Sequence, residues 1–276
     1  MVFEGLGNGS AMIPIILSEV GQFLRTGRSF QLLLVFVLGI LITVSYFLGR
    51  RGKLWEIRPL EALEAIWEGV GRCAEMGRPV MILPGISGLG SPETLAGLTI
   101  FGEVAQRSAE IGVTPISSAS SSEVILASEA IIRSAFTSAG KPELYATGKY
   151  VRWFGGDQFS YAVGAAGQVI ADKPGMCLQI GYFLFDVIVA AETGSRVGSI
   201  QIGGTLGSLN MLAMFCDYVF IGEEIYAASA SISRDKMATA TIAGQDWVKL
   251  IVIVLLIVGA ILGLAGNTDL YKLMGM

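Results

Sequence analysis

The sequence predicts an α/β protein: a mainly parallel, three-layer (Rossmann-like) domain inserted between two transmembrane helices. Two long apolar runs, residues 30–49 and 248–266, flank the middle of the chain, and each matches the roughly 20 residues that cross a bilayer. Between them, short apolar runs alternate with longer helical ones, as in right-handed βαβ crossovers. The short runs are continuously apolar rather than alternating, which is typical of strands in a sheet covered on both faces.

The composition supports a membrane location and argues against nucleic acid as a partner. Hydrophobic residues make up 53% of the chain and charged residues 15%, whereas soluble domains carry about a quarter charged residues. We therefore expect part of the chain to lie in the lipid bilayer. The net charge is −4 and no basic stripe is present, while binding to nucleic acid needs clustered Lys and Arg.

The chain lacks the side chains that most often carry chemistry. It contains no histidine, which is the commonest general base and metal ligand. Cys73, Cys177 and Cys216 stand apart in apolar surroundings without Cys-x-x-Cys spacing, as reduced, buried thiols do. We predict no metal site, no cofactor and no catalytic residue, and the sequence favours a non-enzymatic function.

Positive charges near the two apolar runs predict a two-pass orientation in the cell (inner or plasma) membrane. Most of them lie between the runs or at their inner ends, at Arg50, Arg51, Lys53, Arg58, Arg234, Lys236 and Lys249. By the positive-inside rule, the domain at residues 54–246 is cytoplasmic and both termini lie on the opposite face. Arg25 and Arg28 oppose this assignment.

Two tails lie outside the spans. Residues 1–29 carry apolar side chains at helical spacing, at Ile13, Ile16, Leu17, Val20 and Leu24, which predicts an amphipathic helix. This helix either lies on the membrane face or packs on a neighbouring subunit. Residues 267–276 form a C-terminal tail.

The middle segment predicts strands and helices in alternation. We expect strands at residues 79–85, 113–118, 150–156, 176–181, 199–204 and 218–222. The aromatic side chains of residues 150–156 also suit a loop against the membrane face. We expect helices at residues 91–112, 122–140, 157–171, 182–194, 205–217 and 223–235. The expected N-caps are Ser91, Ser122 and Asp157, and the expected helix stops are Gly112 and Gly140.

Several of these helices present small residues where a surface helix would carry Lys and Glu. The segments "YAVGAAG" and "IYAASAS" are examples. Either such helices pack closely on the sheet, or they also contact other subunits. We expect both.

Candidate ligand-binding residues follow the predicted strands, because parallel sheets bind ligands at the carboxyl ends of their strands. The candidates are Gly85, Ser87, Gly88, Gly90, Ser117, Ser118, Gly203, Gly204, Thr205, Glu223 and Glu224. Their backbone N–H groups and the following helix dipoles could hold an anion. No Lys follows the first glycine loop and no Gly-x-Gly-x-x-Gly is present, so neither nucleotide fingerprint is matched. Tight turns and close packing need the same small residues, and for "IGGT" this second interpretation is preferred.

The carboxylates of the middle segment do not form an obvious pair. Glu223 and Glu224 are adjacent and diverge by about 100° on a helix, so one is expected to be a first-turn dipole partner and either is a possible base. Asp186 lies in an apolar helix and would need a buried partner. Arg152 and Gln201 are the candidates for that partner.

Three stretches carry a resemblance to a known family. They are "SPETLAGLTIFGEVA", "GGDQFSYAVGAAG" and "IQIGGTLGSLNMLAMFCDYVFIGEEIYAASASISRD". With them the chain resembles an uncharacterised prokaryotic membrane-protein family, a domain of unknown function with flanking transmembrane helices. The resemblance covers roughly residues 55–249 and includes the flanking spans. It implies the architecture and assigns no activity, so it transfers no catalytic residue.

Two hypotheses of function follow. The first is a membrane-anchored, non-enzymatic assembly or scaffold protein whose cytoplasmic domain forms a homo-oligomer or docks a larger membrane complex. The second is a membrane-tethered enzyme or sensor that binds an anionic small molecule, a nucleotide or phosphorylated metabolite, at the carboxyl ends of the strands. The first is favoured, because the sequence lacks histidine and both nucleotide fingerprints.

Overall fold

The computed structural model describes residues 29–51 and 57–264. The chain divides into two compact units, residues 56–235 and the flanking residues 1–55 with 236–276. The amphipathic helix predicted within residues 1–29 and the tail at 267–276 lie outside the described residues.

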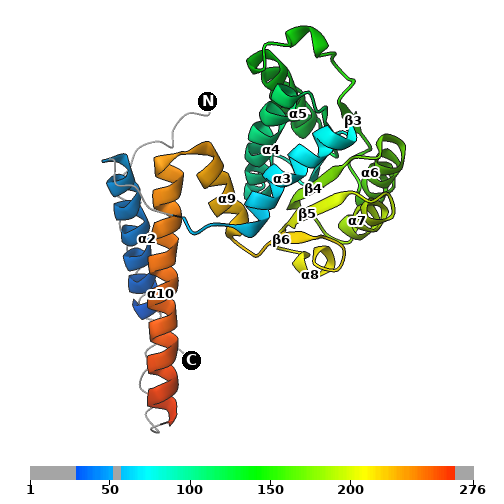
Figure 1. The fold of residues 1–276 in the computed structure, drawn as a ribbon. Helices are drawn as coiled ribbons and strands as arrows, with labels where there is room; N and C mark the ends of the chain where they lie inside the picture. The colour runs from blue at the N-terminus through cyan, green and yellow to red at the C-terminus, as the bar shows by residue number, and fades with distance from the viewer. Residues whose placement is uncertain (1–28, 52–56, 265–276) are drawn as a thin grey trace, which may run out of the picture. The chain divides into compact units, whose positions relative to one another are not determined.

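The flanking unit contains two long helices, α2 (Ser29–Arg50) and α10 (Lys236–Leu264) (Figure 1). Both are long and apolar enough to cross a membrane. Helix α2 matches the predicted span at residues 30–49. Helix α10 begins well before the predicted span at 248, so residues 236–246, which the sequence analysis assigned to the α/β domain, continue this helix.

Small residues allow α2 and α10 to approach closely. A Cβ on Gly244 would lie 2.9 Å from the Cβ of Ser45, and a Cβ on Gly49 would overlap the Cβ of Ala240. These contacts run in opposite order along the two helices, so the pair is antiparallel. Small residues four apart on each helix are a common way for membrane helices to pack.

The α/β unit is built on a six-stranded, all-parallel sheet with strand order β3-β2-β1-β4-β5-β6 (Figure 1). The strands are β1 (Val80–Gly85), β2 (Pro115–Ala119), β3 (Val151–Trp153), β4 (Met176–Tyr182), β5 (Ile200–Gly204) and β6 (Tyr218–Phe220). The predicted strands and their parallel arrangement are confirmed. Pro115 opens β2, where a residue without an N–H is tolerated. Strand β1 is buried along its whole length, as the continuous apolar pattern requires.

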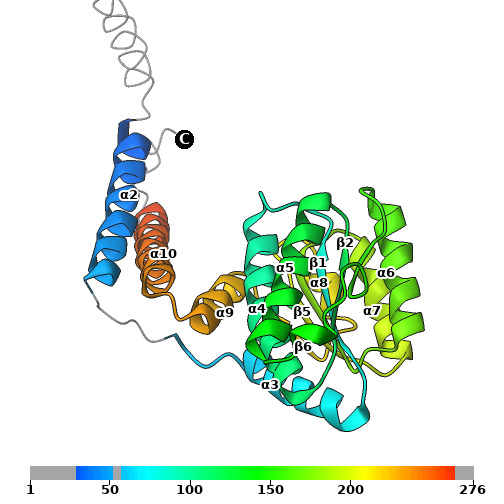
Figure 2. The same cartoon turned by 90° about the horizontal axis from the view of Figure 1, so that it is seen from above.

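Helices lie on both sides of the sheet. They are α3 (Glu61–Met76), α4 (Pro92–Ile111), α5 (Ser122–Ser138), α6 (Gln158–Asp172), α7 (Asp186–Arg196), α8 (Leu209–Leu212) and α9 (Glu224–Ser233), with the 3₁₀ turn η1 (Pro142–Leu144). Figure 2 shows α4 and α5 on one side of the sheet and α6 and α7 on the other. Helix α4 contacts α3, α5 and α9, whereas α6 contacts α7.

Most predicted helix ends are confirmed. Pro92 starts α4 after Ser91, and Gly112 ends it with a φ of +86°. Asp157 caps α6 by accepting hydrogen bonds from the N–H groups of Phe159 (3.1 Å) and Ser160 (3.0 Å). The prediction for α5 is wrong by one residue: Ser121 is the cap and accepts from the N–H of Val124 at 3.4 Å, while Ser122 is already the first helical residue.

Two predicted helices are shorter than expected. The helix predicted at 182–194 begins at Asp186, because β4 continues through Tyr182 and the carbonyl of Tyr182 accepts from the N–H of Ile86 at 3.0 Å. Of the helix predicted at 205–217, only Leu209–Leu212 is α-helical.

Helix α4 packs closely on the sheet through a glycine. A Cβ on Gly97 would overlap the carbonyl oxygen of Ile180 in β4. A larger residue would therefore push α4 away from the sheet. Gly97 thus serves close packing of α4 on the sheet.

Candidate functional site

The predicted site residues lie at or beside the carboxyl ends of four strands, along one edge of the sheet. Gly85 ends β1, and Ser87, Gly88 and Gly90 follow it; Ser117 and Ser118 lie inside β2; Gly203 and Gly204 end β5, and Thr205 follows; Glu223 and Glu224 begin α9 after β6. The structure therefore places them on the edge that the sequence predicted. What they do there is set by their contacts.

The centre of this edge is closed by main chain. The strand order reverses between β1 and β4, which is where doubly wound sheets bind ligands. Gly85 has a φ of +88°, and a Cβ there would overlap the carbonyl oxygen of Tyr182. A Cβ on Gly181 would likewise overlap the carbonyl of Pro84. These two glycines let β1 and β4 remain in contact to their ends.

A buried carboxylate occupies the next position along the edge. Glu93, in the first turn of α4, accepts from the hydroxyl of Thr205 at 3.2 Å and from the N–H of Leu206 at 3.4 Å. Glu93 is 7% exposed and Thr205 is fully buried. The chain itself therefore supplies the negative charge that a helix N-terminus favours.

Gly203 serves packing rather than a ligand. Its Cβ would lie 2.9 Å from Sγ of Cys216 and 3.0 Å from Cδ2 of Leu212. Gly204 is similarly enclosed by Phe220 and Ile225. The preferred interpretation of "IGGT" as a close-packing segment agrees with these contacts.

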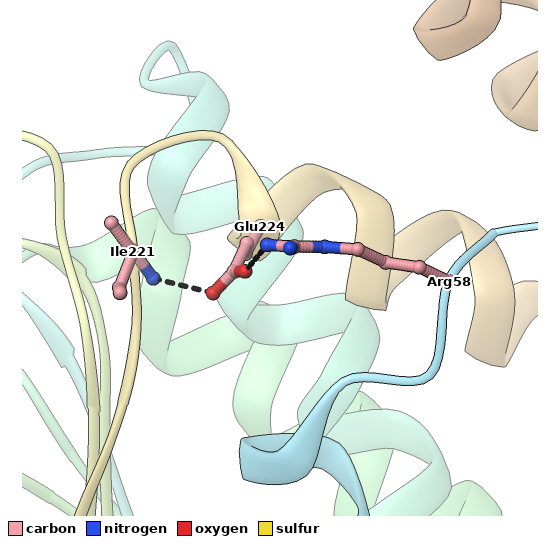
Figure 3. Close-up of polar contacts among 3 residues, drawn as sticks. All are labelled: Arg58, Ile221 and Glu224. Carbon is pink, nitrogen blue, oxygen red and sulfur yellow. Dashed lines mark hydrogen bonds and ion pairs between the residues drawn. The ribbon is translucent and has the colours of Figure 1, made fainter.

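Glu123 and Glu224 occupy two further helix starts. Glu123, in the first turn of α5, lies against Gly88, where its carboxylate fills the space that a Cβ would take. Figure 3 shows Glu224 between the N–H of Ile221, which donates to it at 2.7 Å, and the guanidinium of Arg58. Arg58 is largely exposed, so this ion pair contributes about 0–1 kcal/mol. Glu223 is the N-cap residue of α9, and its side chain makes no capping hydrogen bond to the described part of this helix.

The serines of β2 belong to a buried hydrogen-bond network. The Ser118 hydroxyl lies 3.1 Å from the hydroxyl of Tyr161, and Ser120 donates to the carbonyl of Gly85 at 3.1 Å. Ser117 donates to the carbonyl of Ser118 at 3.3 Å. Burial raises the pKa of Tyr161. Ser118 thus joins β2 to α6, Ser117 bonds within β2, and both hydroxyl-bearing side chains are fully buried.

Asp186 is buried at the same edge, with one oxygen unpaired. Its Oδ1 accepts from the N–H of Leu184 (2.9 Å) and from Nε2 of Gln158 (3.1 Å), while Oδ2 has no hydrogen-bond partner among the residues that the structure describes. Burial raises the pKa of this carboxyl. Both partners predicted for Asp186 are wrong.

The two residues predicted as partners of Asp186 bind elsewhere. Arg152 pairs with Asp172 at 3.0 Å. Gln201 accepts from Nε2 of Gln179 at 2.7 Å. Both pairs join neighbouring elements, and Asp186 is instead bound by Leu184, just before its own helix, and by Gln158 at the start of α6.

The three cysteines are free thiols, with Cys73 and Cys177 buried and Cys216 half-buried. Burial raises the pKa of Cys73 to about 11 and the pKa values of Cys177 and Cys216 to about 12. They are therefore protonated and poor nucleophiles near neutral pH. Within residues 29–51 and 57–264, no three His, Cys, Asp or Glu side chains gather where they could hold a metal ion.

The family described as Domain of unknown function (DUF6754) matches residues 19–274. The chain belongs to this family. The match confirms the predicted resemblance, and it spans the α/β unit together with both long apolar helices. The DUF6754 family has no assigned activity, so membership assigns no reaction to the residues above. No curated protein and no solved structure matches the chain.

The edge of the sheet in this DUF6754 protein is acidic and occupied by its own side chains. Glu93, Glu123, Asp186 and Glu224 each lie in the first turn of a helix. Glu93 and Glu123 were not predicted as site residues, although an acidic residue just inside a helix start is a recognisable signal. Together these carboxylates oppose the approach of an anionic ligand.

A cavity of about 400 Å³ lies at the opposite, amino-terminal ends of the strands. Arg78, Lys149 and Arg152 line it together with Asp172. Arg78 donates to the carbonyls of Lys173 (2.6 Å) and Val197 (3.0 Å), and Arg152 pairs with Asp172. Two of its three cations therefore already bind main-chain or side-chain oxygens at the ends of helices.

Proposed function

We propose that this chain is a membrane-anchored, non-enzymatic assembly protein. Helices α2 and α10 anchor it in the cell membrane, and the α/β unit lies on the cytoplasmic face, where it forms a homo-oligomer or docks a larger membrane complex. The strand order with its reversal between β1 and β4, and the helices on both sides of the sheet, support a doubly wound, three-layer arrangement for this unit. The cations beside the spans support its cytoplasmic side.

The observation that carries the proposal is the apolar surface of the α/β unit. Phe159 is 69% exposed and Val163 is 70% exposed, both on α6. Leu184 and Phe185, beside the start of α7, are also exposed, and the rings of Phe159 and Phe185 lie 5.0 Å apart. Contiguous apolar surface of this kind marks protein or membrane contacts in soluble units.

The strand-end edge gives less support to a nucleotide or metabolite site. Its centre is filled by the contact between β1 and β4, and its helix starts hold the carboxylates of Glu93, Glu123 and Glu224. An anionic ligand would have to displace these groups. Assembly is therefore the better supported of the two functions.

Two measurements on the full chain in detergent test the proposal. Light scattering after gel filtration is expected to give a protein mass that is a multiple of 29.2 kDa. A millimolar panel of nucleotides and phosphorylated metabolites is expected to leave the melting temperature unchanged, whereas a ligand at 100 times its Kd would stabilise by about 2.7 kcal/mol. A monomer whose melting temperature rises with one of these anions would overturn the proposal.

The orientation is tested separately. Protease added outside intact cells that express the chain is expected to leave the α/β unit uncut, and permeabilised cells serve as the control. Digestion in intact cells would place the unit on the other face of the membrane.

A further inference from the structure

Helix α6 presents an uncharged surface to its surroundings. We call this surface the α6 outer face, and it consists of the exposed residues Phe159, Ser160, Val163, Gly167, Ile170 and Ala171. Along it no charged side chain lies between Asp157 and Asp172. Water is a poor match for such a surface, because its large side chains are apolar.

Helix α3 of the same unit shows what a solvated helix looks like. Its exposed residues include Glu61, Glu64, Glu68, Arg72 and Glu75. The two helices have similar lengths and both cover the sheet, yet only α3 carries charges toward water. The difference indicates that the α6 outer face is covered in the working protein.

Gly167 adds an observation of a different kind. It lies inside α6, and a Cβ at this position would meet nothing within 4 Å. Glycine destabilises a helix interior relative to alanine, and no contact within residues 29–51 and 57–264 needs its small size. The open space beside Gly167 is therefore available to a close approach from outside the chain.

We propose that two copies of the chain pair through their α6 outer faces, with the two α6 helices antiparallel about a two-fold axis. Val163 of one copy then packs against Gly167 of the second copy. This inference rests on the proposed assembly function and names its partner. It also names the surface through which the copies bind.

The antiparallel register matches large side chains with small ones. Where Val163 meets Gly167, the same register places Phe159 against Ala171 and Ile170 against Ser160. Each contact occurs twice, as a two-fold interface requires. A parallel pair would instead set Phe159 against Phe159 and Val163 against Val163, so large residues would collide along the face.

The charges at the ends of α6 fit the same register. Asp157 precedes the helix, Lys173 follows it, and both are exposed. In the antiparallel pair each Asp157 lies opposite Lys173 of the second copy, so an ion pair closes each end of the apolar contact. An anionic membrane surface fits less well, because such surfaces attract faces that carry Lys and Arg.

Single cysteines in the full chain, purified in detergent, test the register by oxidative cross-linking. At about 1.5 Å per residue, two copies of position 163 lie about 6 Å apart along the helix axis and two copies of position 159 about 18 Å apart. Val163→Cys is therefore expected to form a covalent dimer and Phe159→Cys is not. The double variant Phe159→Cys with Ala171→Cys is expected to restore the link.

Matched controls separate this result from random collision. Leu126→Cys, on α5, is the control for exposure, since Leu126 is 72% exposed and Val163 is 70% exposed. It is expected to give no dimer. The unmutated chain measures the background from its own cysteines, of which Cys73 and Cys177 are buried.

Enlarging Gly167 tests whether the two copies of α6 approach closely at this residue. Gly167→Leu is expected to convert the dimer to a monomer by light scattering while the α/β unit stays folded, because nothing among the described residues obstructs the new side chain. Gly71→Leu on α3, another exposed helical glycine with nothing within 4 Å of its Cβ, is expected to remain dimeric.

The outcomes distinguish this inference from the proposed function. An oligomeric mass with no dimer from Val163→Cys overturns the α6 interface and leaves assembly standing, as does a Gly167→Leu variant that stays dimeric. Equal cross-linking at positions 159 and 163 overturns the antiparallel register. A native chain that is monomeric overturns the α6 interface, and so does a monomer whose position 163 is protected from thiol reagents only by vesicles of anionic lipid. A monomer whose melting temperature also rises with a nucleotide or phosphorylated metabolite overturns both proposals.

Discussion

Glu93, in the first turn of α4, accepts a hydrogen bond from the hydroxyl of Thr205, the residue that follows β5. The bond joins the connection after β1 to the end of β5, and β4 lies between these two strands in the sheet. Both side chains are buried. The carboxylate of Glu93 therefore links two elements at the carboxyl ends of the strands. A carboxylate at this place in a parallel sheet could equally have bound a ligand.

Removal of this carboxylate is expected to destabilise the α/β unit. Glu93→Ala leaves the Thr205 hydroxyl and the Leu206 N–H without their acceptor, and unsatisfied buried groups cost about 1–3 kcal/mol. Glu93→Gln keeps an acceptor oxygen and should therefore lower the free energy of unfolding less than Glu93→Ala does. Urea unfolding of the full chain in detergent measures both. Glu103→Ala, an exposed position on the same helix, should stay within about 0.5 kcal/mol of wild type, and an equal loss from Glu93→Ala and Glu103→Ala would contradict the assignment.

Gly203→Val tests whether the glycines of "IGGT" serve packing. The new side chain would press on Sγ of Cys216 and on Leu212, and overpacking of a core costs about 1–3 kcal/mol. Gly203→Ala is expected to lower the stability less than Gly203→Val does. Its effect should be smaller still when Cys216→Ala removes the sulfur. Thermal unfolding measures the series. A Gly203→Val variant as stable as wild type would show that the space is open.

The fold was predictable where one physical signal dominates. Continuous apolar runs identified the strands, because a strand buried on both faces has no polar side to show. Asp157 identified the start of α6, because its side chain can accept two N–H groups. The cap of α5 was misplaced by one residue because several serines follow β2, and the end of that strand decides which of them is the cap.

The start of α7 was missed for a tertiary reason. The apolar residues after Gly181 suit a strand and a helix equally, and the pairing of Tyr182 with Gly85 and Ile86 decides in favour of the strand. The sequence also predicted that the candidate residues lie at the carboxyl ends of the strands, but it did not predict which side chains occupy that edge. Glu93 meets Thr205, and Arg58 meets Glu224, across long stretches of chain, and local patterns do not encode such pairs.

The contact between α2 and α10 should fail when Gly49 is enlarged. Gly49→Leu is expected to separate the helices, since even a Cβ there would overlap Ala240. An internal disulfide between Ser45→Cys and Gly244→Cys, detected by mass spectrometry, measures their proximity. The link should form in the parent chain and be lost with Gly49→Leu. Gly39→Leu, on the same helix with nothing within 4 Å of its Cβ, should retain the link, and loss in both variants would point to a general disturbance of α2.

Asp186 makes the stability of the α/β unit depend on pH. Burial raises the pKa of its carboxyl above the ordinary value of 3.8, so the folded chain binds this proton more tightly than the unfolded chain does. As pH rises above 3.8 through the folded pKa, the free energy of unfolding falls by at most about 1.4 kcal/mol per pH unit from this group. Above the folded pKa this contribution levels off.

Asp186→Asn removes this titration while retaining an oxygen for Gln158 and the N–H of Leu184. Relative to wild type, the variant is therefore expected to gain stability as pH rises through the same interval. Urea unfolding of both proteins at a series of pH values measures the difference, and all other titrating groups cancel in it. If the difference stays constant with pH, the carboxyl of Asp186 keeps its ordinary pKa, and its unpaired oxygen must be charged and solvated in the folded protein.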